Sequence, residues 1–118
     1  MRPNALEQVF VGRRGGLVEL RLVLVDPADG RTRATHLAPT GDEREAARWL
    51  GRHLARAGEI EDLRRLRVRS ERGGQLVDAP ALARELVAAF GAERVRDDAR
   101  DSDDAGVRDA AQTGPAKR

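Results

Sequence analysis

Residues 17–25 read LVELRLVLV, the most regular hydrophobic pattern in this chain of 118 residues. Leu20, Leu22 and Leu24 fall on one face of an extended segment, and the side chains between them fall on the other. This period of two predicts a half-buried antiparallel strand whose leucine face belongs to the core. We expect the rest of the chain to pack around this strand.

The segment after this strand predicts a β-hairpin. Residues 26–30 read DPADG, in which proline suits a φ near −65° and glycine accepts a positive φ at little cost. Residues 31–37 are compatible with a second strand. In the register that we expect, Leu20 lies opposite His36, so the second strand supplies the smaller and more polar half of the pair.

A short strand is also predicted before this hairpin, at residues 7–11. The glycine-rich residues 12–16 between the two then form a turn, because glycine gives the backbone the freedom to reverse. The first third of the chain is therefore expected to be a three-stranded meander.

The first helix is predicted at residues 41–57. Thr40 and Glu43 have the spacing of a capping box, in which each side chain bonds the backbone N–H of the other residue. Gly58 follows the last periodic position and is expected to end the helix.

Two short strands and a second helix complete the predicted domain. The strands are expected at residues 63–69 and 75–77, the first with an apolar inner face and a charged outer face. The second helix is expected at residues 79–90, with Asp78 as its cap and Gly91 as its stop.

These elements predict an α+β fold in two layers, with a mainly antiparallel sheet of four or five strands and two helices on one face. Residues 1–96 form one small domain. Residues 97–118 lack apolar periodicity, and we expect a disordered polar tail there. The predicted core consists of Phe10 or its neighbours, Leu20, Leu22, Leu24, Leu50, Leu54, Leu66, Val68, Leu82, Leu86 and Phe90.

Composition excludes several kinds of chemistry. The chain has no cysteine, which rules out disulfides, thiolate metal sites and cysteine nucleophiles. No apolar run approaches the roughly 18 residues of a membrane span, and the first residues lack the apolar centre of a signal peptide. We therefore expect a soluble cytoplasmic protein without membrane contact. Its many arginines beside the single Lys117 are typical of a GC-rich bacterial genome.

Arginines form the main candidate contact site for nucleic acid or a partner. They recur every fourth residue on the first helix and at alternate positions on the later strand: Arg44, Arg48, Arg52, Arg56, Arg65, Arg67 and Arg69. Such groups can bind a phosphate backbone. Against this, acidic residues are interleaved with them, and the chain has one Trp, two Phe and no Tyr for base stacking. A solvated face with ion pairs is the favoured interpretation.

No catalytic, cofactor-binding or metal-binding residue is nominated, and no cofactor is expected. His36 and His53 are the only histidines, and the sequence offers no third ligand to make a metal site with them. Asp26 and Asp29 are explained by turn chemistry, because aspartate at such positions bonds its own backbone.

The order strand, strand, strand, helix, strand, helix over residues 7–91 is similar to the opening of the ribonuclease H-like fold. The resemblance places Glu43 or Glu45 where that family keeps an acid on its first helix, and it implies metal-dependent phosphodiester chemistry. Where that family has an aspartate in its first strand, this chain has residues 9–12, VFVG.

The leading expectation for function is a small non-catalytic interaction or accessory domain. Its partner would be another protein, or a second copy, at an exposed strand edge. The alternative is an arginine-mediated nucleic-acid-binding protein. A degenerate ribonuclease H-like nuclease is the weaker alternative.

Overall fold

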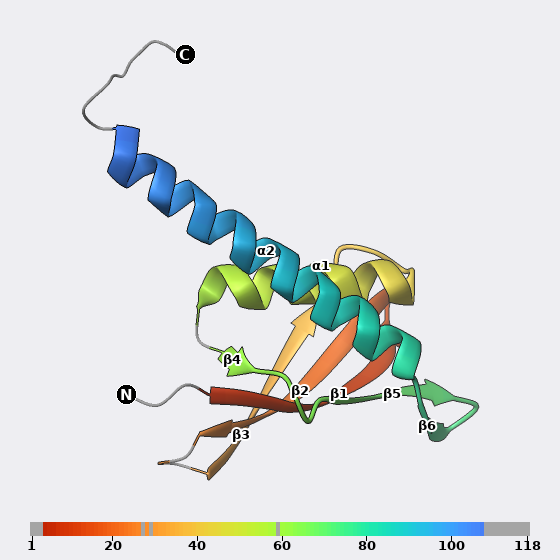
Figure 1. Ribbon diagram of the computed structural model, residues 1–118. Coiled ribbons are helices and arrows are strands. Elements are labelled where there is room, and N and C mark those ends of the chain that lie inside the picture. Colours follow the sequence, from red (N-terminus) through yellow and green to blue (C-terminus); the bar gives the residue numbers. More distant parts are fainter. Residues whose placement is uncertain (1–3, 27, 29, 59, 108–118) are drawn as a thin grey trace.

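A computed structural model describes residues 4–26, 28, 30–58 and 60–107, of which residues 61 and 97–107 by their backbone alone. It confirms the expected α+β fold, with both helices on one face of the sheet (Figure 1). The elements are β1 (Asn4–Arg14), β2 (Leu17–Asp26), β3 (Gly30–Leu37), α1 (Glu43–Ala57), β4 (Ile60–Asp62), β5 (Arg67–Arg72), β6 (Gln75–Asp78) and α2 (Pro80–Val107).

The sheet is mixed and mostly antiparallel, in the order β3-β2-β1-β5-β6, and the short β4 pairs with the beginning of β1. β1 is therefore the central strand, and β2, which contains residues 17–25, lies between β1 and β3. β5 runs parallel to β1, because the chain crosses over the sheet through α1 before it returns.

Both hairpins of the meander follow from local sequence. β2 and β3 pair in the predicted register, with Leu20 opposite His36, and the Ala28 N–H donates to Asp26 Oδ1 at 2.7 Å. The turn between β1 and β2 is narrower than predicted and consists of Gly15 and Gly16, whose φ angles are 60° and 83°. Such positive angles suit a two-residue hairpin turn and are cheap only for glycine.

The core lies between the sheet and the helices. Most of the predicted core residues are buried, but Phe10 is not, because it lies on the opposite face of β1 from its buried neighbours Val9 and Val11. Leu24 and Leu66 are only partly buried. The largest fully buried apolar side chains are Leu6, Val9, Val18, Leu20, Leu22, Leu50 and Leu86.

The helix caps differ from the prediction. Asp42, not Thr40, caps α1, because its carboxylate accepts the N–H groups of Arg44 and Glu45. The Thr40 hydroxyl instead accepts the N–H of Asp42 itself. Gly58 ends α1 as expected, with φ at 73°.

Asp78 does not cap α2. The helix begins at Pro80, which leaves Ala79 in the cap position, and the Asp78 carboxylate accepts from Arg67 on the neighbouring strand. The ion pair between β5 and β6 thus uses the Asp78 carboxylate, which the sequence pattern had assigned to the cap of α2.

Two predicted boundaries are also wrong. The strand predicted at residues 63–69 is replaced by β4 before it and by β5, which begins at Arg67. α2 passes through Gly91 and continues to Val107, beyond the edge of the sheet (Figure 1). A glycine inside a helix costs about 1 kcal/mol relative to alanine, which is too little by itself to end it. The first part of the predicted disordered tail, residues 97–107, belongs to α2. For residues 108–118, which lie outside the described residues, disorder stays a prediction.

The two helices meet most closely at Gly51 of α1. A Cβ atom there would overlap the carbonyl oxygen of Leu86 and lie 2.9 Å from the backbone nitrogen of Phe90. Only glycine fits, because the obstructing atoms belong to the backbone of α2 and cannot rotate away. Within the part of the chain that the structure describes, neither helix is long and apolar enough to cross a membrane.

Gly51→Ala should therefore destabilise the protein by roughly 1–3 kcal/mol, the usual cost of overpacking. Gly91→Ala is the matched control, because its added methyl group would meet nothing within 4 Å. It should be neutral or stabilise α2 by up to about 1 kcal/mol. Urea unfolding followed by circular dichroism measures both. Equal effects of the two substitutions would contradict the close crossing.

Asp42→Ala should cost about 1 kcal/mol, because it removes the acceptor for the first N–H groups of α1. Thr40→Ala should cost less, since the Thr40 hydroxyl lies outside the helix. The free energies of unfolding of the two variants show which residue caps α1. A larger loss for Thr40→Ala than for Asp42→Ala would favour Thr40 as the cap.

Candidate functional site

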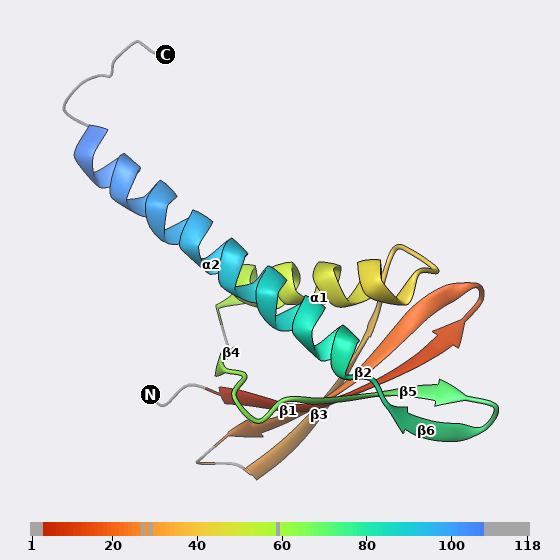
Figure 2. The same cartoon turned by 45° about the vertical axis from the view of Figure 1, so that its right-hand side comes forward.

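The predicted contact arginines lie on two opposite surfaces. Those of α1 belong to the helix layer. Arg67 and Arg69 of β5 alternate with the buried Val68 and Ser70, so they point to the outer face of the sheet, which neither helix covers (Figure 2). The seven arginines therefore do not form one continuous patch.

The arginines of α1 mainly tie the two helices together. Arg48 pairs with Glu85 of α2 at 3.1 Å, and Arg56 pairs with Glu93 at 2.9 Å. The Glu93 side chain is only 2% exposed, and Arg96 of α2 lies 3.6 Å from its other carboxylate oxygen, so two arginines compensate this buried charge. For Arg44 and Arg52, no ion pair is found among the described residues.

The later arginines are held in different ways. Arg67 pairs with Asp78 at 3.1 Å. Arg69 donates to Gln8 Oε1 at 2.7 Å, and its guanidinium lies 5.1 Å from the centre of the Phe10 ring. Arg65 is exposed and borders a hollow of about 610 Å³ near β4.

The sequence prediction did not include the arginines of β2 and β3. Arg21 is opposite Thr35, and Arg33 is opposite Val23, so both arginines lie on the same outer face as Phe10. Alternation along each strand was the available signal. The pairing of β1 with β2 was also needed, because it places Phe10 opposite Arg21.

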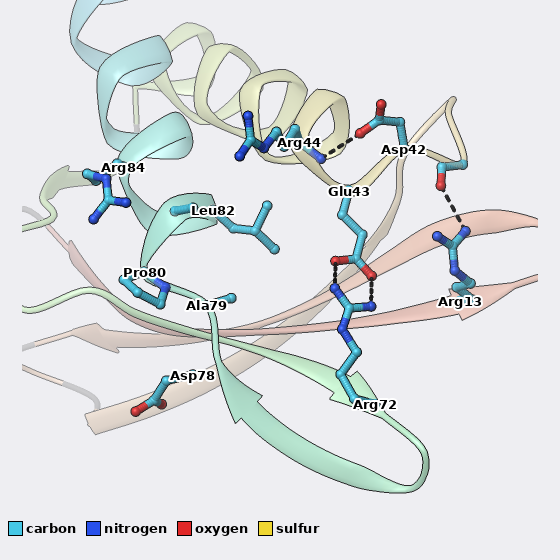
Figure 3. Close-up of a pocket in the computed structure, with 12 residues that line it drawn as sticks. Arg13, Asp42, Glu43, Arg44, Arg72, Asp78, Ala79, Pro80, Leu82 and Arg84 are labelled. Carbon is cyan, nitrogen blue, oxygen red and sulfur yellow. Dashed lines mark hydrogen bonds and ion pairs between the residues drawn. The ribbon is translucent and has the colours of Figure 1, made fainter.

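A cleft lies between the first turns of α1 and α2 and the β5–β6 hairpin, and we call it the helix-start cleft (Figure 3). Its volume is about 810 Å³. Most of its charged groups are already engaged. Arg72 makes a two-pronged contact with Glu43 at 2.9 and 3.0 Å, and Arg13 donates to the carbonyl oxygen of Gly41. Among the described arginines that line it, Arg44 and Arg84 have neither an ion pair nor a side-chain hydrogen bond.

Glu43 is one of the two acids, with Glu45, that the ribonuclease H-like resemblance singled out. Its carboxylate accepts from Arg72 and from the Ser70 hydroxyl at 3.2 Å, so it joins α1 to β5. Over the residues that the structure describes, no group of three or more His, Cys, Asp or Glu side chains could hold a metal ion. The geometry of Glu43 suits a structural role.

A smaller cavity of about 270 Å³ lies on the outer face of the sheet, and we call it the outer-face cavity. Phe10, Val23 and Leu76 give it an apolar floor, and Arg21 and Arg33 border it. Its lining contains no carboxylate, in contrast to the helix-start cleft.

One end of the sheet is an exposed apolar edge. β6 pairs only with β5, and all four of its residues are exposed. Leu76 is 46% exposed and Val77 is 47% exposed, which is unusual for large aliphatic side chains on adjacent positions.

The two histidines, His36 and His53, lie side by side in the structure, although no motif spacing relates them in the sequence. Their ring centres are 5.0 Å apart, and His53 stacks on Trp49 at 5.2 Å. Burial and the nearby His53 lower the pKa of His36 below its usual value. The neutral form of His36 is therefore favoured in the folded protein.

Stability should consequently fall as the pH drops through the pKa of His36. The unfolded chain binds the proton more readily than the folded chain, so this contribution is present above the ordinary histidine pKa and is lost in acid. Urea midpoints between pH 7.5 and 5.5 should fall for the parent and fall less for His36→Gln. His53→Gln should remove only the smaller part of the effect. A parental slope in His36→Gln would contradict this account.

Comparison with known proteins gives no relative from which a role could be taken. No protein-family model, no curated protein and no solved structure matches this chain. The candidate surfaces are thus the helix-start cleft, the outer-face cavity and the edge of β6.

Proposed function

We propose that the protein is a small non-catalytic binding module that takes an extended segment of a partner protein along the free edge of β6. The observation that carries the proposal is the exposure of Leu76 and Val77 on a strand with only one neighbour. Unpaired strand edges accept further strands, and alternate side chains give such pairing its specificity. The proposal keeps the cytoplasmic location expected from the sequence.

The backbone of β6 offers hydrogen bonds in the right direction. Ser70 lies opposite Val77, and the Ala79 N–H donates to the Val68 carbonyl at 2.8 Å. These residues therefore form the inward-bonded pairs of the antiparallel ladder. The alternation leaves the N–H and C=O groups of Leu76 and Asp78 pointing to the free edge.

The side chains of β6 suit a partner on both faces. Leu76 lies on the outer face of the sheet, and Val77 lies on the opposite face, the one that the helices cover elsewhere. The β5–β6 hairpin extends away from the helices (Figure 2). An added strand would find one aliphatic neighbour on each face. Such cross-strand pairs contribute about 0.2–1 kcal/mol each.

The other edge, β3, is less suited to this role. It carries Arg31 and Arg33 on its outer face, and charged side chains on an edge oppose pairing with another strand. β6 has no arginine or lysine, and its one charge, on Asp78, is paired with Arg67.

Nucleic-acid binding is the second candidate. The exposed Arg44 and Arg84 at the helix-start cleft, which have no ion pair among the described residues, favour it. The engagement of Arg48 and Arg56 with α2 weakens it. We do not propose a nuclease, because Glu43 is held by Arg72.

Leu76→Pro tests the leading proposal. Proline removes the outward N–H but leaves the inward bonds of the ladder, so folding should be preserved. We expect extended peptides selected from a random displayed library to bind the parent and to bind Leu76→Pro at least about tenfold more weakly. Hydrogen exchange at the Leu76 and Asp78 amides should slow when such a peptide is bound.

Arg44→Gln is the control and should bind these peptides as the parent does. Sedimentation of the free protein distinguishes a second copy as the partner, because self-association would also be lost in Leu76→Pro. Equal peptide binding by both variants would refute the edge. A salt-sensitive gel shift with DNA or RNA, lost in Arg44→Gln/Arg84→Gln, would favour the second candidate.

A further inference from the structure

The outer-face cavity combines an apolar floor with a cationic border. Phe10 of β1, Val23 of β2 and Leu76 of β6 provide the floor, and Arg21 and Arg33 lie beside it on β2 and β3. Both helices lie on the other side of the sheet, so this floor is not covered by them (Figure 2). The cavity brings together side chains that are far apart in the sequence.

The charges around this cavity are not balanced by the protein. Within the described part of the chain, neither Arg21 nor Arg33 has an ion-pair partner, and no carboxylate lines the cavity. The neighbouring arginines differ in this respect. Arg31 pairs with Glu7 at 3.2 Å, and Arg67 pairs with Asp78 at 3.1 Å.

The positions of Arg21 and Arg33 make this imbalance significant. Arg21 is opposite Thr35 and Arg33 is opposite Val23, so the two arginines are diagonal neighbours on adjacent strands. Diagonal positions are about 7–8 Å apart, within reach of long side chains, and like charges there repel. An anion between the two guanidinium groups would offset the repulsion, and arginine binds carboxylate, sulfonate and phosphate groups with paired hydrogen bonds.

We propose that the outer-face cavity binds a small organic anion that joins a flat apolar body to one carboxylate, sulfonate or phosphate group. The cavity volume of about 270 Å³ is near the lower limit for small-molecule sites, so the cavity suits a ligand of one or two rings. The apolar body lies on Phe10, Val23 and Leu76, and the anionic group lies between Arg21 and Arg33. This inference does not rest on the proposed function, although Leu76 borders both sites.

A nucleic-acid strand fits these observations less well. Phe10 is the one aromatic ring among the described residues that line the cavity, so successive bases would find no row of stacking platforms. A long phosphate backbone also calls for a row of free cations, whereas Arg31 and Arg67 on either side are paired with carboxylates.

The test uses 5-dimethylaminonaphthalene-1-sulfonate, a two-ring aromatic sulfonate dye whose fluorescence rises when it leaves water. The folded full chain should bind one equivalent. Arg21→Gln/Arg33→Gln should weaken binding at least about tenfold, since it removes the charge-assisted hydrogen bonds to the sulfonate. Arg31→Gln/Arg67→Gln removes the same charge from the same face and should change binding less than about twofold. Circular dichroism should show both variants folded.

Competition then tests the ligand class. Salicylate should displace the dye, whereas equal concentrations of sulfate or neutral benzyl alcohol should not, because each lacks one half of the ligand. Amide NMR shifts on addition of salicylate should centre on Phe10, Arg21 and Arg33. Absence of dye binding, equal losses in the two double variants, or displacement by sulfate alone would overturn the proposal. Displacement by oligo-dT but not by salicylate would also overturn it, in favour of a polyanion surface.

Discussion

The backbone contact between α1 and α2 at Gly51 constrains the rest of the molecule. Because the helices cross without an intervening side chain, they lie together on one face of the sheet and seal the leucine and valine core beneath them. Two ion pairs, Arg48 with Glu85 and Arg56 with Glu93, then join the same helices on either side of the crossing. Arg48 and Arg56, which an isolated α1 would present to solvent, thus help to hold the two helices together.

This arrangement leaves the opposite face of the sheet uncovered. β1 lies at its centre and presents Phe10 outward, between Arg21 of β2 and Arg69 of β5. A sheet with one covered face commonly alternates apolar inward and polar outward residues, as residues 19–22 of β2 do. Phe10 and Val23 depart from it, and they form the floor of the outer-face cavity.

The layers are also joined away from the core. Glu43, at the start of α1, accepts hydrogen bonds from both Arg72 and Ser70 of β5. This link holds β5 against α1 near the turn of the β5–β6 hairpin. A hairpin held in this way has less backbone freedom to lose on binding, which supports the proposed addition of a strand at β6 (Figure 2).

The sequence by itself determined what depends on neighbours along the chain. It determined the α+β class, the β2–β3 register with Leu20 opposite His36, and the end of α1 at Gly58. Alternation, turn residues and helix-stop residues act over a few positions, so no distant contact is needed to interpret them. The same local signals placed most of the core.

Tertiary structure alone decided what depends on contacts between distant segments. It made β1 the central strand. It paired Asp78 with Arg67, so that Asp78 does not cap α2. It also paired Arg48 and Arg56 with glutamates of α2. It also gathered the outer-face cavity from separate strands. The physical reason is that a charged side chain takes whichever partner the fold brings near, and strand order is set by non-local pairing that no short pattern encodes.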